Sequence, residues 1–437
     1  MKFISFFASG GQKPRICLVG GLILFLYGIL VFNLYNIQIK KADYYTERAE
    51  AQFSFSKTLK PDRGTIYFTD KNGSKIPAVI GKSYPVIFAV PKEIEDPQEI
   101  SATLHELLGL DGASLLSRFK NPYDLYERLV PKAGDTAIKK IKDSELKGIY
   151  IAEENYRYYP FGSLGAHILG FVGFGDDGKE IGRYGIEKFY ESLLAGTYGS
   201  LRGDQIEKST PGTDVYLTID RNIQSRAEEI LSSLVQDRQA IGGTIIVQEP
   251  VSGKILTMAS YPTFDPNNYA NFNYSTFLNQ AQSAIYEPGS VFKVLTMAAA
   301  LDAGRVKPDT KFYDAGELQL NGKTIKNWDL KAHGSVTMTE VIEESINTGA
   351  AFAERQLGHD NFYKYLLRFG FGELSGINLP GEIKGSLRTL IKPAQDINFA
   401  TVSFGQGVSV TPIGLINAVA SIANGGFLMR PYVTNDV

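Results

Sequence analysis

The segment YEPGSVFKVLTMAAALDAG, residues 286–304, carries residue types that could form a serine nucleophile and its base. Pro288 and Gly289 break the preceding chain and an apolar helix should follow, so Ser290 is expected at a helix N-terminus. There, unpaired N–H groups and the helix dipole favour developing negative charge. Lys293 lies three residues on, hence on the same helix face, and burial would disfavour its ammonium form. The pattern predicts a serine activated by a neutral lysine.

The Ser-x-x-Lys spacing by itself is weak evidence, because the same spacing recurs at Ser54/Lys57 and at Ser144/Lys147. Both of these copies lie among polar residues. Neither has a preceding Pro-Gly or a long apolar helix after it, so we interpret them as chance matches. Taken in isolation, Ser290 is equally consistent with a helix N-cap.

A second motif supports the nucleophile interpretation. In EESINTGAAF, residues 343–352, Ser345 and Asn347 form a Ser-x-Asn triplet that begins 55 positions after Ser290. Such a triplet can place a hydroxyl beside the Ser-Lys pair for proton relay, and an amide that holds the substrate backbone and the lysine. Alone, the stretch could equally be a loop of turn-forming residues. Together, the two motifs match the set shared by serine β-lactamases and penicillin-binding proteins.

From about residue 33 to the end, the sequence resembles the monofunctional, class B penicillin-binding proteins. Three blocks resemble signatures of that family's pedestal domain, which β-lactamases lack, and four resemble its transpeptidase-domain blocks in the family's order. The first block departs from the family pattern, because Phe68 and Thr69 move its aspartate to Asp70. The blocks are RGTIYFTDKNG (63–73), RYYPFGSLGAHILGFVG (157–173), YGIEKFYESLLAGTYG (184–199), YEPGSVFK, SINTGAAF, FGFGELSGINLPGE (369–382) and SFGQGVSVTPIGL (403–415).

The resemblance implies a role for each motif residue. Ser290 would attack the penultimate D-alanine carbonyl of a peptidoglycan stem peptide and form an acyl-enzyme, with Lys293 as the base. Ser345 would help pass the proton to the departing D-alanine, and Asn347 would position the substrate. An amino group of a neighbouring stem would then take the acyl group and form a cross-link, and penicillins would be trapped at Ser290 in the same way.

The resemblance also implies partners and further contacts. In the SFGQG block, Gly405, Gln406 and Gly407 are expected to bind substrate. The reaction needs no metal or organic cofactor. A membrane glycan polymerase is the expected protein partner, contacted through the membrane anchor and the pedestal.

The family's third catalytic element, a Lys-Thr/Ser-Gly triplet on an edge strand beyond the SFGQG block, is not found before the last residue, Val437. Lys323-Thr324 is followed by isoleucine and precedes the Ser-x-Asn triplet, which is the wrong position. That strand supplies a lysine for the substrate carboxylate and one donor of the oxyanion hole, worth about 2.7 to 4 kcal/mol. We therefore expect the sequence to be a fragment of a longer protein, the alternative being a truncated, inactive homologue.

An apolar run at residues 16–39 is expected to hold the protein in a membrane. Its 24 residues carry no charge, which as a helix suffices to cross a hydrocarbon core of about 30 Å. Residues 1–15 would form a cytoplasmic tail and the bulk of the chain would lie outside the cytoplasm, although two lysines directly after the run oppose this orientation. A cleaved signal peptide is the alternative. The charges that favour the orientation belong to Lys2, Lys13 and Arg15.

Two further domains are expected beyond the anchor. Residues 40–210 predict a mixed α/β, extended pedestal, with a strand at 84–90 and a helix at 96–110. Residues 211–437 predict an α+β transpeptidase-like domain, an antiparallel sheet packed with helices and incomplete at its C-terminus. Its expected elements are a strand at 214–220, a helix at 221–237, a hairpin of 242–250 with 254–262, and mainly helices over 288–356.

Composition excludes several other classes of function. The 437 residues include 45 basic and 47 acidic ones, so a net charge of -2 gives no case for nucleic acid as partner. Cys17 is the single cysteine, which rules out an internal disulfide framework. The adjacent acidic pairs at 153–154 and 343–344 do not face one another as a glycosidase pair must. The histidines lack metal-ligand spacing and are interpreted as structural or surface residues: His105, His167, His333 and His359.

Three functions therefore remain open at this point. The first is a D,D-transpeptidase, based on the two serine motifs. The second is an inactive, membrane-anchored scaffold of the wall-synthesis complex, suggested by the missing third motif. The third is a β-lactam sensor, which would keep the Ser-Lys chemistry without cross-linking.

Overall fold

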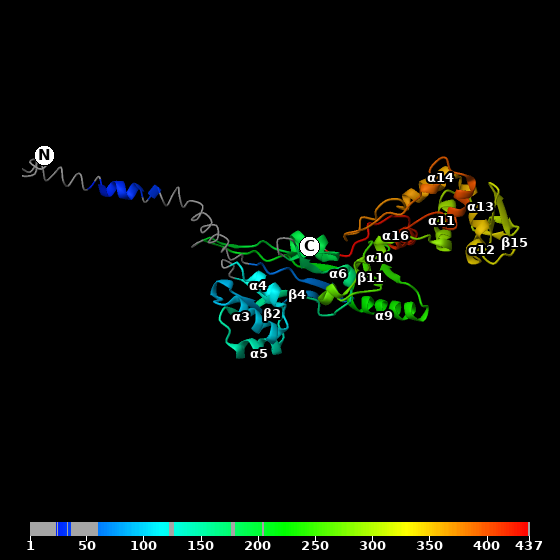
Figure 1. Ribbon diagram of the computed structural model, residues 1–437. Coiled ribbons are helices and arrows are strands. Elements are labelled where there is room, and N and C mark those ends of the chain that lie inside the picture. Colours follow the sequence, from blue (N-terminus) through cyan, green and yellow to red (C-terminus); the bar gives the residue numbers. More distant parts are fainter. Residues whose placement is uncertain are drawn as a thin grey trace, which may run out of the picture. The chain divides into compact units, whose positions relative to one another are not determined.

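The computed structural model describes residues 23, 25–32, 34–35, 60–121, 126–175, 180–202 and 205–435 (Figure 1). The predicted cytoplasmic tail, most of the predicted anchor at 16–39 and the Ser54/Lys57 pair lie outside these ranges. No helix within them is both long and apolar enough to cross a membrane.

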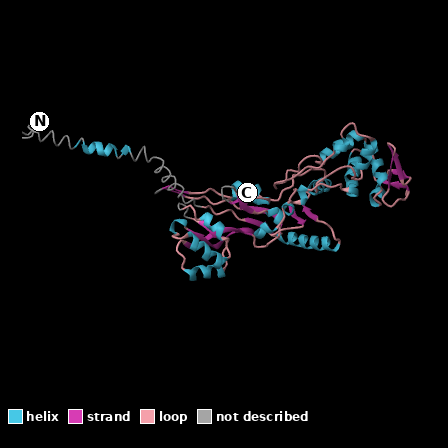
Figure 2. Ribbon diagram, viewed as in Figure 1, coloured by secondary structure: helices cyan, strands magenta, loops and turns pink. Residues whose placement is uncertain are grey.

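The chain folds into two compact units that interleave along the sequence. Both contain helices and strands, which confirms the predicted α+β class (Figure 2). Of the residues from Pro61 onward, the first unit contains Pro85–Ala152 and Thr197–Thr210, and the second contains Pro61–Tyr84, Glu153–Gly196 and Pro211–Val437.

In the first unit, helices pack on a short sheet around an apolar core. The carboxylate of Asp96 caps α3 (Pro97–Leu108) by accepting hydrogen bonds from two backbone N–H groups, and Gly109 ends the helix in the left-handed conformation. This confirms the helix predicted at 96–110. Leu104 is fully buried in the core. The remaining elements are η2 (Pro91–Glu93), α4 (Gly112–Arg118), β3 (Glu127–Val130), α5 (Asp135–Ser144), β7 (Ser200–Arg202) and β8 (Gln205–Glu207).

The predicted strand at 84–90 is the end of a longer strand, β2 (Lys75–Ala89), which pairs there with β3. In the second unit, the start of β2 pairs antiparallel with β1 (Ile66–Thr69), and β1 pairs parallel with β9 (Val215–Asp220). The strand predicted at 214–220 is thus present as β9. Strand β4 (Ile149–Tyr158) also pairs with β2.

A buried ion cluster joins the pedestal-like blocks within the second unit. Glu187, fully buried in α7 (Gly185–Phe189), accepts a hydrogen bond of 2.7 Å from Arg63 Nε and one of 2.5 Å from Arg157 Nε. These residues come from three separate sequence blocks, so the ion cluster explains why all three carry charge at buried positions. The neighbouring elements are α6 (Ala166–Leu169), β5 (Val172–Phe174), β6 (Glu180–Gly182) and α8 (Glu191–Leu194).

The predicted helix at 221–237 and the hairpin after it are both confirmed. Asp220 caps α9 (Arg221–Asp237), which lies beside β11 (Ile255–Tyr261) (Figure 1). Strands β10 (Gly243–Gln248) and β11 pair antiparallel. The elements that follow in the second unit are η3 (Pro266–Asn271), η4 (Tyr274–Phe277), α10 (Gln280–Ser283) and, later in the chain, α16 (Pro412–Ala423).

Helices surround a second apolar core between residues 289 and 402, but the prediction of mainly helices over 288–356 was incomplete. Four short strands interrupt this stretch, seen as magenta arrows in Figure 2. Each has only four residues and a largely exposed face, so even the alternation of β13, ELQL, is too short to indicate a strand by itself. The strands are β12 (Lys311–Asp314), β13 (Glu317–Leu320), β14 (Lys323–Lys326) and β15 (Gly334–Thr337); the helices are η5 (Gly289–Phe292), α11 (Lys293–Asp302), α12 (Met338–Glu343), α13 (Asn347–Leu357), α14 (His359–Arg368), η6 (Arg388–Leu390) and α15 (Asp396–Val402).

Candidate active site

Ser290 lies in the 3-10 turn η5, which leads directly into α11. Gly289 before it has φ +63°, a left-handed conformation that favours glycine. Phe292 and Leu295 are fully buried and anchor the turn in the helical core. The serine is therefore presented at the start of a helix on a fixed support.

Lys293 lies in the same helix start and contacts both motif serines. Its side chain is almost fully buried, at 2% exposure. The Nζ atom is 3.2 Å from Ser290 Oγ, 2.9 Å from Ser345 Oγ and 2.5 Å from the Ser345 carbonyl oxygen. Burial lowers the pKa of Lys293 to about 8, since desolvation disfavours the ammonium form, and no carboxylate of the described residues pairs with it.

These three contacts define where a proton can go. The carbonyl oxygen of Ser345 can only accept, so it fixes one N–H of Lys293. In the neutral amine, the second N–H can point to Ser345 Oγ, which leaves the lone pair facing Ser290 Oγ. The arrangement allows Lys293 to take the proton of Ser290, with Ser345 as the second hydroxyl in reach.

Ser345 adopts a backbone conformation that is unusual for its type. It lies between α12 and α13 with φ +55°, where a residue with a side chain is strained by roughly 1 kcal/mol or more. Ile346 beside it is fully buried. The strained conformation brings both the carbonyl oxygen and the hydroxyl of Ser345 to Lys293.

Asn347 begins α13, and its side chain joins the site to strand β14. Its Nδ2 donates a hydrogen bond of 2.8 Å to the Lys326 carbonyl oxygen. The expected hydrogen bond from this amide to Lys293 is not formed. Since β14 holds the amide by its nitrogen, the Oδ1 atom of Asn347 is left to accept from a ligand.

A buried carboxylate that the sequence did not single out supports this region. Asp314 is fully buried and accepts four hydrogen bonds, from Thr348 Oγ1 at 2.7 Å, the Gly316 N–H at 2.8 Å, Asn327 Nδ2 at 2.7 Å and the His333 N–H at 3.0 Å. These bonds outweigh the desolvation by burial and lower the pKa of Asp314. The same hydrogen bonds connect the start of α13 to the end of β12, which carries Asp314, and to Asn327, which follows β14.

The predicted substrate-binding loop lies against the nucleophile turn. The Gly289 N–H donates to the Gly405 carbonyl oxygen at 3.1 Å, and the Gly407 N–H donates to Glu287 Oε1 at 2.8 Å. Gly405 has φ +81°, and a Cβ there would lie 2.1 Å from the Gly289 carbonyl oxygen. Only glycine allows this close approach. Gln406 is exposed beside the turn.

The other residues considered from the sequence lie elsewhere. Ser144 donates to the Ile141 carbonyl oxygen and Lys147 pairs with Glu95, so this Ser-x-x-Lys copy forms no pair of its own. The described residues contain no cluster of metal-ligating side chains.

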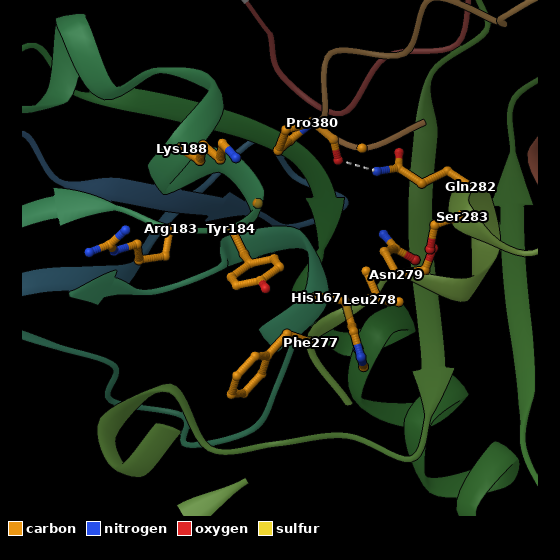
Figure 3. A pocket seen from close by; sticks show the side chains of 12 residues that line it. His167, Arg183, Tyr184, Lys188, Phe277, Leu278, Asn279, Gln282, Ser283 and Pro380 are labelled. Atoms are coloured by element: carbon orange, nitrogen blue, oxygen red, sulfur yellow. Dashed lines mark hydrogen bonds between the residues drawn. The ribbon is translucent and has the colours of Figure 1, made fainter. Parts of the chain in front are cut away.

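A cavity of about 90 Å³ shares no lining residue with the Ser290 region (Figure 3). His167 is one of its lining residues. Its Nε2 atom lies at hydrogen-bonding distance, 2.9 Å, from the Thr276 carbonyl oxygen. Burial lowers the pKa of His167 to about 4, so the ring is neutral near pH 7. Gln282 donates from Nε2 to the Pro380 carbonyl oxygen at 2.7 Å. These contacts are those of structural side chains.

Comparison with known proteins finds two domain families in the chain. Residues 243–437 match the penicillin binding protein transpeptidase domain, and residues 58–217 match the penicillin-binding protein dimerisation domain. Stage V sporulation protein D of Bacillus subtilis is 34% identical over 95% of this chain, and the chain spans 66% of its length.

Two further similarities agree with these matches. A peptidoglycan D,D-transpeptidase FtsI homolog of Mesostigma viride is 30% identical, with 96% of this chain and 73% of that protein covered. The penicillin-binding protein in a structure of the complex between PBP2 and MreC from Helicobacter pylori has the same fold, with a TM-score of 0.74 at 21% identity over 87% of this chain and 79% of that one.

Proposed function

Because the chain belongs to the class B penicillin-binding proteins, we propose that it cross-links peptidoglycan stem peptides as a serine D,D-transpeptidase and binds penicillins covalently. The observation that carries the proposal is the position of Lys293 Nζ, 3.2 Å from Ser290 Oγ and 2.9 Å from Ser345 Oγ. A buried amine with a pKa of about 8 is a suitable base near neutral pH.

In the proposed acylation step, Ser290 Oγ attacks the carbonyl carbon of the penultimate D-alanine while its proton moves to neutral Lys293. The tetrahedral intermediate then loses its C–N bond. The proton returns through Ser345 Oγ to the leaving nitrogen, and free D-alanine departs. The products are the ester at Ser290 and a neutral Lys293.

In the second step, an amino group of a neighbouring stem attacks the ester and gives up one proton by the reverse route. The new amide is the cross-link, and the proton restores Ser290. A penicillin acylates Ser290 in the same way, but its leaving nitrogen stays attached to the acyl group. The attached nitrogen therefore still occupies the site that the acceptor amine needs, so the ester at Ser290 is not attacked and persists.

Asn347 and the loop at Gly405–Gly407 have positioning roles in this proposal. Asn347 Oδ1 accepts an N–H of the bound stem, because its Nδ2 is already held by Lys326. The glycines of the loop keep the Ser290 turn in place through the Gly289 to Gly405 hydrogen bond. Misplacement of a nucleophile by about 1 Å can lower a rate about a hundredfold.

The proposal extends to organisation and location. Residues 16–39 would form the membrane anchor with a cytoplasmic tail at 1–15, since their uncharged run is long enough to span a bilayer. Residues 40–210 would form the pedestal and 211–437 the transpeptidase domain. A membrane glycan polymerase is the proposed protein partner, contacted through the anchor and the pedestal.

Labelling with a fluorescent penicillin tests the function. Ser290→Ala should abolish the label, whereas Ser144→Ala, which changes another described Ser-x-x-Lys copy, should leave it intact. Cross-linking of two synthetic stem peptides by the full-length protein separates a transpeptidase from a β-lactam sensor. Label that survives Ser290→Ala would refute the proposed nucleophile.

A further inference from the structure

A polar cavity of about 410 Å³ adjoins the proposed site. Strand β14 and Asn347 form one wall, and the loop at Gln406 and Gly407 forms another together with α15. Asn347 belongs to the Ser-x-Asn motif, and the loop contacts the residues on either side of Pro288. The cavity is therefore a lateral extension of the Ser290 region and can hold part of the same ligand.

The charges that line the cavity are of one sign. Its twelve lining residues include Lys323 and Lys326 but neither aspartate nor glutamate. Lys326 Nζ lies 3.9 Å from a carboxylate oxygen of Glu317, an exposed and weak pair. Lys323 has no acidic partner among the described residues. Its ammonium group is the cation available to an anionic ligand.

The strand that carries both lysines is held at each end. At the hairpin tip, the Ile397 N–H donates to Asn321 Oδ1 at 3.1 Å, and at the other end Asn347 binds the Lys326 carbonyl oxygen at 2.8 Å. Between them, Ile325 is buried in an apolar cluster with α13 and α15. The backbone of Lys323 is thus held in place relative to Asn347. The charge of Lys323 can therefore position a ligand that also contacts Asn347.

We propose that this cavity receives a second carboxylate of the stem peptide, on a residue that precedes the acylated D-alanine, with Lys323 as the cation that binds it. This inference rests on the proposed transpeptidase function. A neutral peptide would be bound in the cavity by hydrogen bonds alone, and the charge of Lys323 would stay unpaired. The cavity fits an acidic stem because a carboxylate can pair with Lys323, in a lining without acidic residues, and can also accept from the neighbouring hydroxyls and amides.

The test compares two synthetic acyl donors that end in D-alanyl-D-alanine and differ only in one upstream side chain, which ends in a carboxylate or in the carboxamide. D-alanine release from the full-length protein gives the acylation rate for each. The wild type should prefer the acidic donor by about fivefold, as expected for a partly exposed charge pair near 1 kcal/mol. Lys323→Ala should remove the preference and Lys323→Glu should reverse it.

Two controls keep the outcomes distinct. Lys331→Ala, an exposed lysine of the same region outside the cavity, should retain the preference. Benzylpenicillin acylation should stay within twofold of wild type in all three variants, because Lys323 does not contact Ser290. Equal rates for the two donors in the wild type, or a preference that survives Lys323→Ala, would overturn the inference alone. Failure of both penicillin and peptides to acylate Ser290 would overturn the proposed function as well.

Discussion

Replacement of the buried carboxylate Asp314 by asparagine should damage both stability and acylation. Asp314 accepts four hydrogen bonds with two oxygens. An asparagine keeps one oxygen and points an NH₂ group at two donors, so two bonds are lost whichever way the amide turns. Each hydrogen bond to a buried charge contributes about 1.5 to 3 kcal/mol, so the loss of two predicts a decrease of about 3 to 6 kcal/mol in the free energy of unfolding.

The damage should reach the reaction because the same network holds the Ser-x-Asn motif. Thr348, which donates to Asp314, directly follows Asn347. We expect Asp314→Asn to lower the rate of penicillin acylation about tenfold under conditions where the variant is still folded. Thr348→Val removes one of the four bonds and should give a smaller loss of stability, about 1.5 to 3 kcal/mol.

Urea unfolding followed by tryptophan fluorescence measures the stability directly. The chain has one tryptophan, Trp328, which follows Asn327 of the network and reports on this region. Asp309→Asn, at an exposed aspartate, is the matched control and should change nothing. An Asp314→Asn variant that loses less than about 1 kcal/mol and acylates at the wild-type rate would refute the reasoning.

The difference in the free energy of unfolding between wild type and Asp314→Asn should depend on pH in a definite direction. The folded protein lowers the pKa of Asp314 from its ordinary value of 3.8. A lowered carboxyl pKa gives stability that is fully present above pH 3.8 and is lost as the pH falls through the folded-state value. The difference in the free energy of unfolding between wild type and Asp314→Asn should therefore be constant near neutral pH and become smaller in acid.

Other changes test the contacts around the site and in the ion cluster. Gly405→Ala should lower penicillin acylation at least about tenfold because its Cβ would displace the Gly289 turn, whereas Gly425→Ala, also at positive φ but with nothing within 4 Å, should change it less than about twofold. Equal effects in the two variants would contradict the role given to the contact. Glu187→Gln should lower stability by about 3 to 5 kcal/mol, since it leaves buried Arg157 without a carboxylate partner and Arg63 with Glu191 alone. Glu191→Gln, at 31% side-chain exposure, should cost about 1 kcal/mol or less, and thermal unfolding of both variants checks the difference.

Local signals in the sequence predicted the elements whose determinants lie within a few residues. The helix at 221–237 follows a capping aspartate, Asp220, and its apolar residues recur at helical spacing. The Ser290/Lys293 pair is local for the same reason, because three residues along a helix start bring two side chains to one face. Spacing alone could not show that Ser345 completes the group, since that depends on tertiary packing.

The features that the sequence did not predict depend on contacts between distant residues. Asp314 has no motif of its own, and its partners are spread up to Thr348. Strands β12 to β15 have four residues each and are partly exposed, so the alternation that some of them show is too short to indicate a strand. One signal was available, because Asn321-Gly322 is a preferred pair for a two-residue hairpin turn, and both residues have positive φ as that turn requires.

The pH dependence of acylation at Ser290 tests the central claim, that buried Lys293 accepts the serine proton. With a pKa of about 8, the amine is neutral in about 9% of molecules at pH 7 and about 91% at pH 9. The single-turnover rate of benzylpenicillin acylation, with the adduct mapped to Ser290 by mass spectrometry, should rise about tenfold between these values with a midpoint near pH 8. A rate that is flat from pH 7 to 9, or one that rises only near the ordinary lysine pKa of 10.5, would contradict the claim.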